Sequence, residues 1–215
     1  MWTYITSVYF MHNKDCNDLL NDDQFYTFLN KITAFILAYT IMKPCFTSLR
    51  PPLLTEMVNI IAGKEITFST YRFDAKDLRN MLNSFMFTGN RPITRAMLMW
   101  WAFHNEHQEL FLLGTRLEIE HIYAKNRFPV PDNIEALGNK SILEKDINIR
   151  ASDYRFKDKA NYYLARVPGK TGTKVYELVE MAKTRQDFTG EDIAERNQKM
   201  IDTFMDFIAG NNLFR

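Results

Sequence analysis

Residues 116–150 read RLEIEHIYAKNRFPVPDNIEALGNKSILEKDINIR, and this stretch holds the pattern on which the fold class depends. Apolar and polar side chains alternate over residues 117–122, as they do in a half-buried strand. After a loop with two prolines, the run at residues 136–143 predicts a second short strand, and the residues from Asn148 onward favour a helix. The sequence therefore predicts two strands followed by a helix.

Helices are predicted before this stretch. Residues 25–39 place apolar side chains at the i, i+3, i+4, i+7 spacing of a helix with one buried stripe. Three further helices are expected, with starts and stops marked by proline, aspartate and glycine: from the Pro51-Pro52 pair to Gly63, from Asp74 to Gly89, and from Pro92 to about Phe103.

A closing helix is predicted near the end of the sequence. Thr189 is its expected N-cap, with Asp192 at the third helical position, and Gly210 follows its final turn. The expected fold is therefore mainly α-helical, with a small ββα-metal unit inserted between helices. Its expected regions are a helical one at 1–110 and an HNH-like nuclease one at 111–215.

The composition indicates a packed, soluble protein. Of the 215 residues, 46% are hydrophobic and 25% are charged, which is ordinary for a globular chain. Two cysteines without paired spacing are typical of a reducing compartment, so a cytoplasmic location is expected. The apolar first residues lack a basic start and a cleavage site. The apolar stretch at residues 25–42 is interrupted by Asn30 and Lys31, so no membrane span is predicted.

Four polar residues in the ββα pattern are suited to hydrolytic chemistry. Hydrolysis of a phosphodiester requires a base that takes a proton from water and a hard cation that neutralises charge on the phosphate oxygens. His121 suits the first task, because the pKa of histidine lies near neutrality. Oxygen atoms of Glu120 and Asn148 suit Mg²⁺ or Mn²⁺ better than zinc. Asn139, after a glycine, begins the second strand.

These residues resemble a known family. The runs Ile-Glu-His-Ile at 119–122 and Leu-Gly-Asn-Lys-Ser-Ile-Leu at 137–143, then Asn148 and the Ser-x-x-x-Phe-x-x-Lys run at 152–159, look like the HNH-related carboxy-terminal domain of GmrSD-type modification-dependent restriction endonucleases. The terminal Phe-Thr-x-x-x-Ile-x-x-Arg run at 188–196 is similar to the last helix of that family, and residues 91–101 resemble its preceding helix. The resemblance covers about residues 75–209.

The resemblance implies a metal-dependent DNA endonuclease that acts in defence against invading phage DNA. It implies that His121 is the general base and that Asn139 holds its loop. Asn148 and Glu120 would bind Mg²⁺ or Mn²⁺, and Lys159 would lie near the scissile phosphate.

The sequence departs from the family at two places and leaves one metal ligand open. Tyr-Ala at 123–124 stands where the family has a proline soon after the histidine, and Lys140 stands in place of a leucine. Neighbouring residues on a regular strand face opposite sides, so Glu120 and His121 share a site only if the strand ends there. Glu118 is therefore an alternative metal ligand.

Basic residues gather between Arg150 and Lys174, with aromatic residues among them. Contacts of lysine and arginine with phosphates dominate the affinity of proteins for nucleic acids. DNA binding is therefore expected of Arg150, Arg155, Lys157 and Lys159. The alternative is a helix face that simply faces solvent.

Other functions and partners stay open at this point. The family normally carries an amino-terminal nucleotide-handling domain with an Asp-Gly-Gln-Gln-Arg motif, and this sequence contains no Asp-Gly pair. A nucleotide-handling partner is therefore expected outside this chain, which is a stand-alone remnant, a split subunit or a piece of a longer protein. The alternative functions are a catalytically inactive HNH-like DNA-binding or assembly subunit and a structural helical interaction domain. RNA remains an alternative substrate, because the reaction takes place at the phosphate and does not depend on the sugar.

Overall fold

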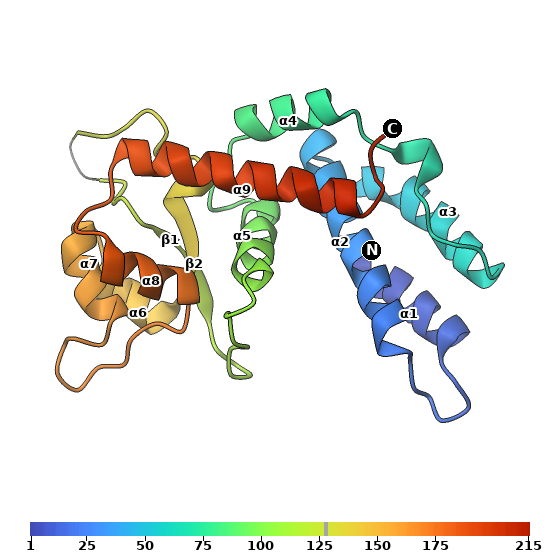
Figure 1. Cartoon of the computed structure of the whole chain (residues 1–215), viewed down its shortest axis with the longest axis horizontal. Coiled ribbons are helices and arrows are strands. Elements are labelled where there is room, and N and C mark those ends of the chain that lie inside the picture. Colours follow the sequence, from blue (N-terminus) through green and yellow to red (C-terminus); the bar gives the residue numbers. More distant parts are fainter. Residues whose placement is uncertain (127–128) are drawn as a thin grey trace. The chain divides into compact units, whose positions relative to one another are not determined.

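A computed structural model describes residues 1–126 and 129–215 (Figure 1). The chain is mainly helical, and the described residues contain a small antiparallel sheet of two strands, so the expected fold class is confirmed at this level. The helices are α1 (Trp2–Asn13), α2 (Asp22–Met42), α3 (Arg50–Ile61), α4 (Ala75–Ser84), α5 (Pro92–His104), α6 (Lys145–Ala151), α7 (Phe156–Tyr163), α8 (Tyr176–Thr184) and α9 (Gly190–Gly210). The strands are β1 (Leu117–His121) and β2 (Lys140–Glu144).

The chain forms two compact units. The first contains Met1–Phe85 together with Ile201–Arg215, and the second contains Met86–Met200. This division differs from the expected boundary at residue 110. Helix α5 belongs to the second unit because it packs against β2. The end of the chain belongs to the first unit because its last residues pair with a segment near Phe73.

Aromatic side chains form much of the core of the first unit. The rings of Phe35 and Phe68 stack with centroids 3.7 Å apart. Phe68 has a left-handed backbone conformation with a φ of 48°, which is uncommon for a residue with a side chain. Its N–H donates to the buried carboxylate of Glu56 at 2.7 Å, which holds this turn. Nearby, Phe73 forms a parallel bridge with Phe214 and so ties the chain end to the unit.

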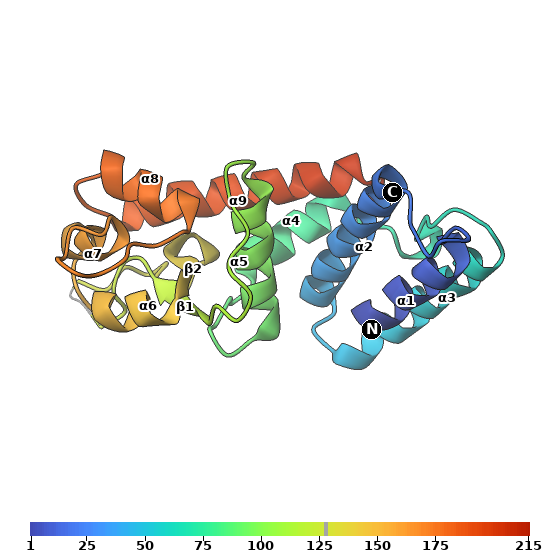
Figure 2. The same cartoon turned by 90° about the horizontal axis from the view of Figure 1, so that it is seen from below.

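Helix α2 is the long apolar helix of the first unit. Among the described residues it is the one helix long and apolar enough to cross a membrane, and 44% of its most apolar window is buried within the fold. A core helix of a soluble protein has the same length and composition. Helix α1 lies beside α3 (Figure 2).

Local capping signals fix several helix ends. The side chain of Asp74 accepts the N–H of Asp77 at 3.0 Å, which confirms the expected start of α4. At the start of α9, Thr189 and Asp192 bond reciprocally as a capping box. The expected stop of α4 at Gly89 was wrong, because this helix already ends at Ser84.

The second unit contains the ββα arrangement. Strands β1 and β2 pair antiparallel, with His121 opposite Lys140, and α6 follows β2 directly and packs against both strands (Figure 1). The helix expected after Asn148 is in fact two helices, α6 and α7. Ser152 separates them, because its φ of 42° and ψ of −146° cannot continue a helix.

Helix α9 packs directly on the turn that precedes β2. A Cβ atom at Gly138 would lie 2.2 Å from the carbonyl oxygen of Ile193 and 2.6 Å from the backbone nitrogen of Asn197. Only a glycine therefore permits this close approach. The N–H of Gly138 also donates to the side-chain oxygen of Asn197 at 3.1 Å, so the turn is held to the helix.

Arg196 of α9 also forms hydrogen bonds with the turn that precedes β2. Its buried guanidinium donates to the carbonyl oxygens of Gly138 and Lys140, each at 2.8 Å. It also forms a two-pronged pair with the carboxylate of Glu177 at 2.7–2.8 Å. Burial raises the pKa of Glu177, but the charge of Arg196 together with the hydrogen bonds from Arg196 and Trp101 lowers it below its usual value. The closing helix thus stabilises the backbone that carries Asn139.

Candidate active site

A cleft of about 590 Å³ follows strand β1 in the second unit. Its lining comes from α5 and the segment before it, from β1 and from α6: Gly89, Asn90, Arg91, Pro92, Arg95, Leu117, Glu118, Ile119, His121 and Asn148. The side chains of neighbouring residues in β1 point to opposite faces of the sheet. The cleft meets residues of both faces, which indicates that it runs along the edge of β1 that is not paired with β2. Glu118, His121 and Asn148 therefore border one cleft. His121 and Asn148 are expected site residues, and Glu118 is the alternative metal ligand.

His121 is the last residue of β1 and borders this cleft. Its side chain is 22% exposed, but its Nε2 is buried and has no hydrogen-bond partner. Desolvation, and then the positive charge of Lys140, lowers the pKa of His121 to about 4. The imidazole is therefore neutral near pH 7, which is the form that can accept a proton.

Asn139 holds the backbone that follows His121. It is fully buried, and its side-chain oxygen accepts the N–H of Tyr123 at 2.7 Å. Its Nδ2 donates to the carbonyl oxygens of Tyr123 at 3.1 Å and Ile134 at 2.9 Å. Its own carbonyl oxygen accepts the N–H of Ile122 at 2.9 Å. The Asn139 side chain therefore makes hydrogen bonds with the backbone just beyond the end of β1, in place of backbone pairing. The expected role of Asn139, to hold the loop of His121, needs such bonds.

Asn148 of α6 lies against Glu118 of β1. Its Nδ2 donates to Oε2 of Glu118 at 2.9 Å, and Nζ of Lys145 lies 3.7 Å from Oε1. The Glu118 side chain is 39% exposed, so the carboxylate remains open to solvent and to ions. Within the described ranges, no group of three or more His, Cys, Asp or Glu side chains could hold a metal ion. The oxygen donors available here are one carboxylate and one amide.

The structure places Glu120 and Lys159 differently from expectation. Their side chains are almost completely buried and form an ion pair at 2.6 Å, and Lys159 also donates to the carbonyl oxygen of His121 at 2.6 Å. The hydroxyl of Tyr163 donates to the same Glu120 oxygen at 2.8 Å. Desolvation raises the pKa of Glu120, although Lys159 opposes this. Neither side chain lines the cleft.

Strand geometry explains this correction. Because β1 stays regular up to His121, Glu120 and His121 leave it on opposite faces. Glu118 leaves β1 on the same face as Glu120, but Glu118 stays partly exposed, whereas Glu120 is buried and paired with Lys159 of α7. The expected metal contact of Glu120 and the expected phosphate contact of Lys159 do not fit these positions. Glu118 is the carboxylate beside Asn148.

The expected DNA-binding residues are spread over two helices and differ in exposure. Arg155 and Lys157, at the start of α7, are exposed. Arg150 of α6 is half-buried, donates to the carbonyl oxygen of Thr171 at 3.2 Å and has a buried, unpaired Nε. Lys159, the fourth, is inside the unit.

Sequence reasoning missed the two arginines that line the cleft. Arg91 immediately precedes α5 and Arg95 lies in its first turns, where Arg95 donates to the carbonyl oxygen of Leu117. The helix start predicted at Pro92 shows that Arg91 and Arg95 lie at the beginning of a helix. Nothing in the sequence pattern shows that α5 lies along β1, so these arginines could not be assigned to the site in advance.

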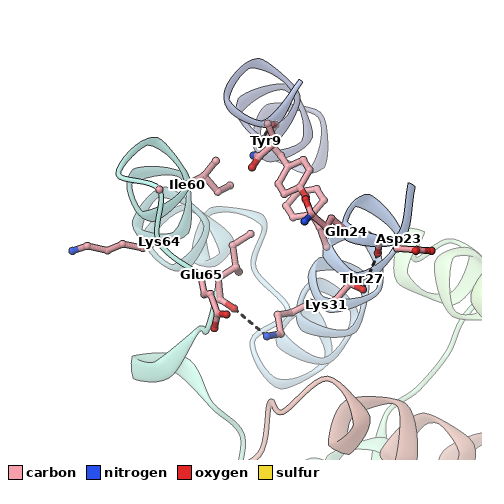
Figure 3. A pocket seen from close by; sticks show the side chains of 12 residues that line it. Tyr9, Asp23, Gln24, Thr27, Lys31, Ile60, Lys64 and Glu65 are labelled. Carbon is pink, nitrogen blue, oxygen red and sulfur yellow. Dashed lines mark hydrogen bonds between the residues drawn. The ribbon is translucent and has the colours of Figure 1, made fainter. Parts of the chain in front are cut away.

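A second hollow, of about 550 Å³, lies in the first unit between α1, α2 and the end of α3 (Figure 3). Lys31 of α2 reaches across it and donates to the carbonyl oxygen of Ile66 at 3.1 Å. Asp23 and Glu65 supply its acidic groups, and no histidine lines it. It contains none of the expected site residues.

No protein-family model, curated protein or solved structure matches this chain. The family resemblance therefore depends on the motif residues alone.

Proposed function

We propose that this chain is a metal-dependent endonuclease that hydrolyses phosphodiester bonds of DNA in the cleft along β1. One observation carries the proposal: Glu118, His121 and Asn148 border a single cleft, and they come from the strand and the helix of a ββα arrangement. Asn139 supports it, because it holds the backbone directly after His121. The HNH-like unit is part of this proposal.

His121 is the proposed general base. Its neutral imidazole accepts the proton of the water that attacks phosphorus. Burial depresses its pKa in the free protein, and the negative charge of a phosphate bound in the cleft shifts this pKa back upward. The free protein thus keeps the base unprotonated, and substrate binding increases its proton affinity.

Glu118 and Asn148 are the proposed ligands of Mg²⁺ or Mn²⁺. Nδ2 of Asn148 faces Glu118, which leaves the amide oxygen as its metal-binding atom. One carboxylate and one amide oxygen form the hard donor set that these ions prefer, and Mg²⁺ commonly keeps several waters. When bound, the ion supplies neutralisation of charge on the leaving oxygen.

DNA binding in this proposal depends on two sets of cations. Arg91 and Arg95 line the cleft, where they would contact the phosphates that flank the cut. Arg155 and Lys157 are exposed at the start of α7, shortly after α6 in the chain, and would add contacts with DNA that do not depend on the base sequence. Reversal of Arg155 and Lys157 to Glu should weaken binding of all DNA sequences alike and reduce its salt dependence. The control is Lys76→Glu, a charge reversal at an exposed position of α4.

The biological setting follows from the family resemblance. We propose that the substrate is foreign or modified DNA, that the reaction takes place in the cytoplasm, and that a nucleotide-handling partner domain acts together with this chain. A foreign or modified substrate fits a defence system, since such a system must separate invading DNA from the DNA of the cell.

Plasmid nicking tests this proposal. Supercoiled plasmid is incubated with the protein and Mg²⁺ or Mn²⁺, with chelator in a parallel reaction and a structured RNA in another. Metal-dependent conversion to the nicked form supports the proposal, and cleavage of RNA alone would change its substrate. Absence of nicking with either ion, by protein that still binds DNA, would contradict it.

The rival function is a catalytically inactive HNH-like DNA-binding or assembly subunit, and one observation favours it. Glu118 and His121 leave β1 on opposite faces, and the carboxylate of Glu118 is already paired with Asn148. DNA binding that is unaffected by metal, together with no nicking, is the result that this rival predicts.

A further inference from the structure

Glu135 lies in the loop between the two strands, and its carboxylate meets three nitrogen groups. Its Oε1 accepts Nζ of Lys125 at 2.5 Å, and its Oε2 accepts Nζ of Lys140 at 2.8 Å. The same Oε2 lies 3.7 Å from Nε2 of His121. Lys140 also donates to the backbone oxygen of Glu135 at 2.7 Å, so the loop and the carboxylate are held by one lysine.

The buried Nε2 of His121 lacks a partner, and Glu135 is the carboxylate beside it. A buried polar atom without a hydrogen bond costs about 1–3 kcal/mol. A small approach of the imidazole to Glu135 would supply that bond. A carboxylate partner on one ring nitrogen fixes which nitrogen carries the proton and how the ring is oriented.

We propose that Glu135 is a positioning residue that holds His121 with a proton on Nε2 and leaves Nδ1 as the nitrogen that accepts a proton from water. This inference rests on the proposed nuclease function. As Nδ1 takes the proton, the oxygen of the resulting hydroxide bonds to phosphorus. The bond from phosphorus to the leaving oxygen breaks, and that oxygen takes a proton from solvent. Glu135 stabilises the imidazolium through the Nε2–H.

Two lysines keep Glu135 in the charged form that this role needs. Burial raises the pKa of Glu135, but hydrogen bonds from Lys125 and Lys140 lower it to about 2. The carboxylate therefore stays anionic at neutral pH and does not take the proton itself. Lys140 is completely buried, whereas Lys125 is exposed, so the first fixes the carboxylate and the second adds charge at the surface.

The test uses Glu135→Gln in the full chain, because this change keeps the size of the side chain and removes its charge. Two lysines then compete for one acceptor oxygen, and Nε2 loses its anionic partner. Histidine labelled with ¹⁵N reports the tautomer directly, and the His121 signals are assigned by their loss in His121→Ala. We expect the Nε2–H tautomer in the wild type and a mixture of tautomers in Glu135→Gln.

Kinetics supply the second readout. We expect kcat for plasmid nicking to fall by about 100-fold in Glu135→Gln, the lower end of the contribution made by the general base that Glu135 positions, with KM nearly unchanged. Glu135→Asp should restore part of kcat, because it returns the charge at a greater distance. Lys125→Met removes one of the two cations that hold Glu135 and keeps the carboxylate, so it should retain the tautomer and lower kcat by less than Glu135→Gln does. The control is Glu109→Gln at an exposed site.

These readouts separate the two proposals. An unchanged tautomer in Glu135→Gln overturns the positioning role, whether or not the protein cuts DNA. A wild type that does not nick DNA overturns the nuclease function, and the tautomer then still decides whether Glu135 orients His121. A fall in kcat that Lys125→Met reproduces in full would also contradict the role of Glu135, because it would indicate a general effect of the loop.

Discussion

Replacement of Lys159 by methionine tests whether this lysine stabilises the fold or binds DNA. The side chains of Lys159 and Glu120 are 1% and 5% exposed and form an ion pair at 2.6 Å. Methionine fills similar space without the charge. In Lys159→Met the Glu120 carboxylate stays buried, and the hydroxyl of Tyr163 is left as its hydrogen-bond donor.

The expected loss of stability follows from that burial. Removal of one partner from a buried ion pair typically costs about 3–5 kcal/mol, because the other charge is left without compensation. Lys159 also donates to the carbonyl oxygen of His121, which adds about 1 kcal/mol. Desolvation raises the pKa of Glu120, so protonation of this carboxyl limits the total. We expect about 3–4 kcal/mol at pH 7.

Urea denaturation in a Trp2→Phe background, followed by the fluorescence of Trp100 and Trp101, measures this loss in the second unit. The double variant Glu120→Gln with Lys159→Met should recover at least about 2 kcal/mol, because no buried charge remains. Lys157→Met, an exposed change on the same helix, is the control and should cost under about 0.5 kcal/mol. A loss below about 1 kcal/mol in Lys159→Met, with weaker DNA binding, would refute the structural role.

Three further predictions concern the surroundings of the cleft. The pKa of His121 is about 4 in the folded protein and 6.5 in the unfolded chain, so the unfolded chain binds more protons between these pH values. The free energy of unfolding should therefore fall by up to about 3 kcal/mol as the pH drops from 6.5 to 4. Denaturation at stepped pH should show this loss in the wild type and not in His121→Gln. Asn139→Ala removes three hydrogen bonds and should cost about 2–4 kcal/mol in the same denaturation assay, and a loss below about 1 kcal/mol would mean that water replaces them. Gly138→Ala places a Cβ against the carbonyl oxygen of Ile193 and should cost about 2 kcal/mol or more in thermal melts, whereas Gly89→Ala, where nothing lies near, should be nearly neutral.

Elements with strong local signals could be predicted from the sequence. Asp74 caps α4, and Thr189 with Asp192 caps α9, because a capping side chain bonds to the backbone within its own turn. Two helices were missed. Helix α1 has little apolar periodicity, whereas α8 is amphipathic but short, so its pattern repeats too few times to stand out in the sequence.

The site was harder to predict, because its chemistry depends on partners far apart in the sequence. Asn139 fits its expected role because its contacts lie in the adjoining loop. Glu120 and Lys159 stand in motif positions, but the pairing that buries them joins a strand to a helix well downstream. Glu135 carries no pattern at all, and only the folded loop brings it beside His121.

The most direct test of the nuclease assignment compares single-turnover plasmid nicking by the wild type, His121→Ala and His107→Ala, with folding checked by circular dichroism. His107 is exposed and lies outside the cleft, so it controls for loss of a histidine as such. We predict metal-dependent nicking that falls by at least about 100-fold in His121→Ala and is unchanged in His107→Ala. Nicking by His121→Ala at the wild-type rate would contradict it.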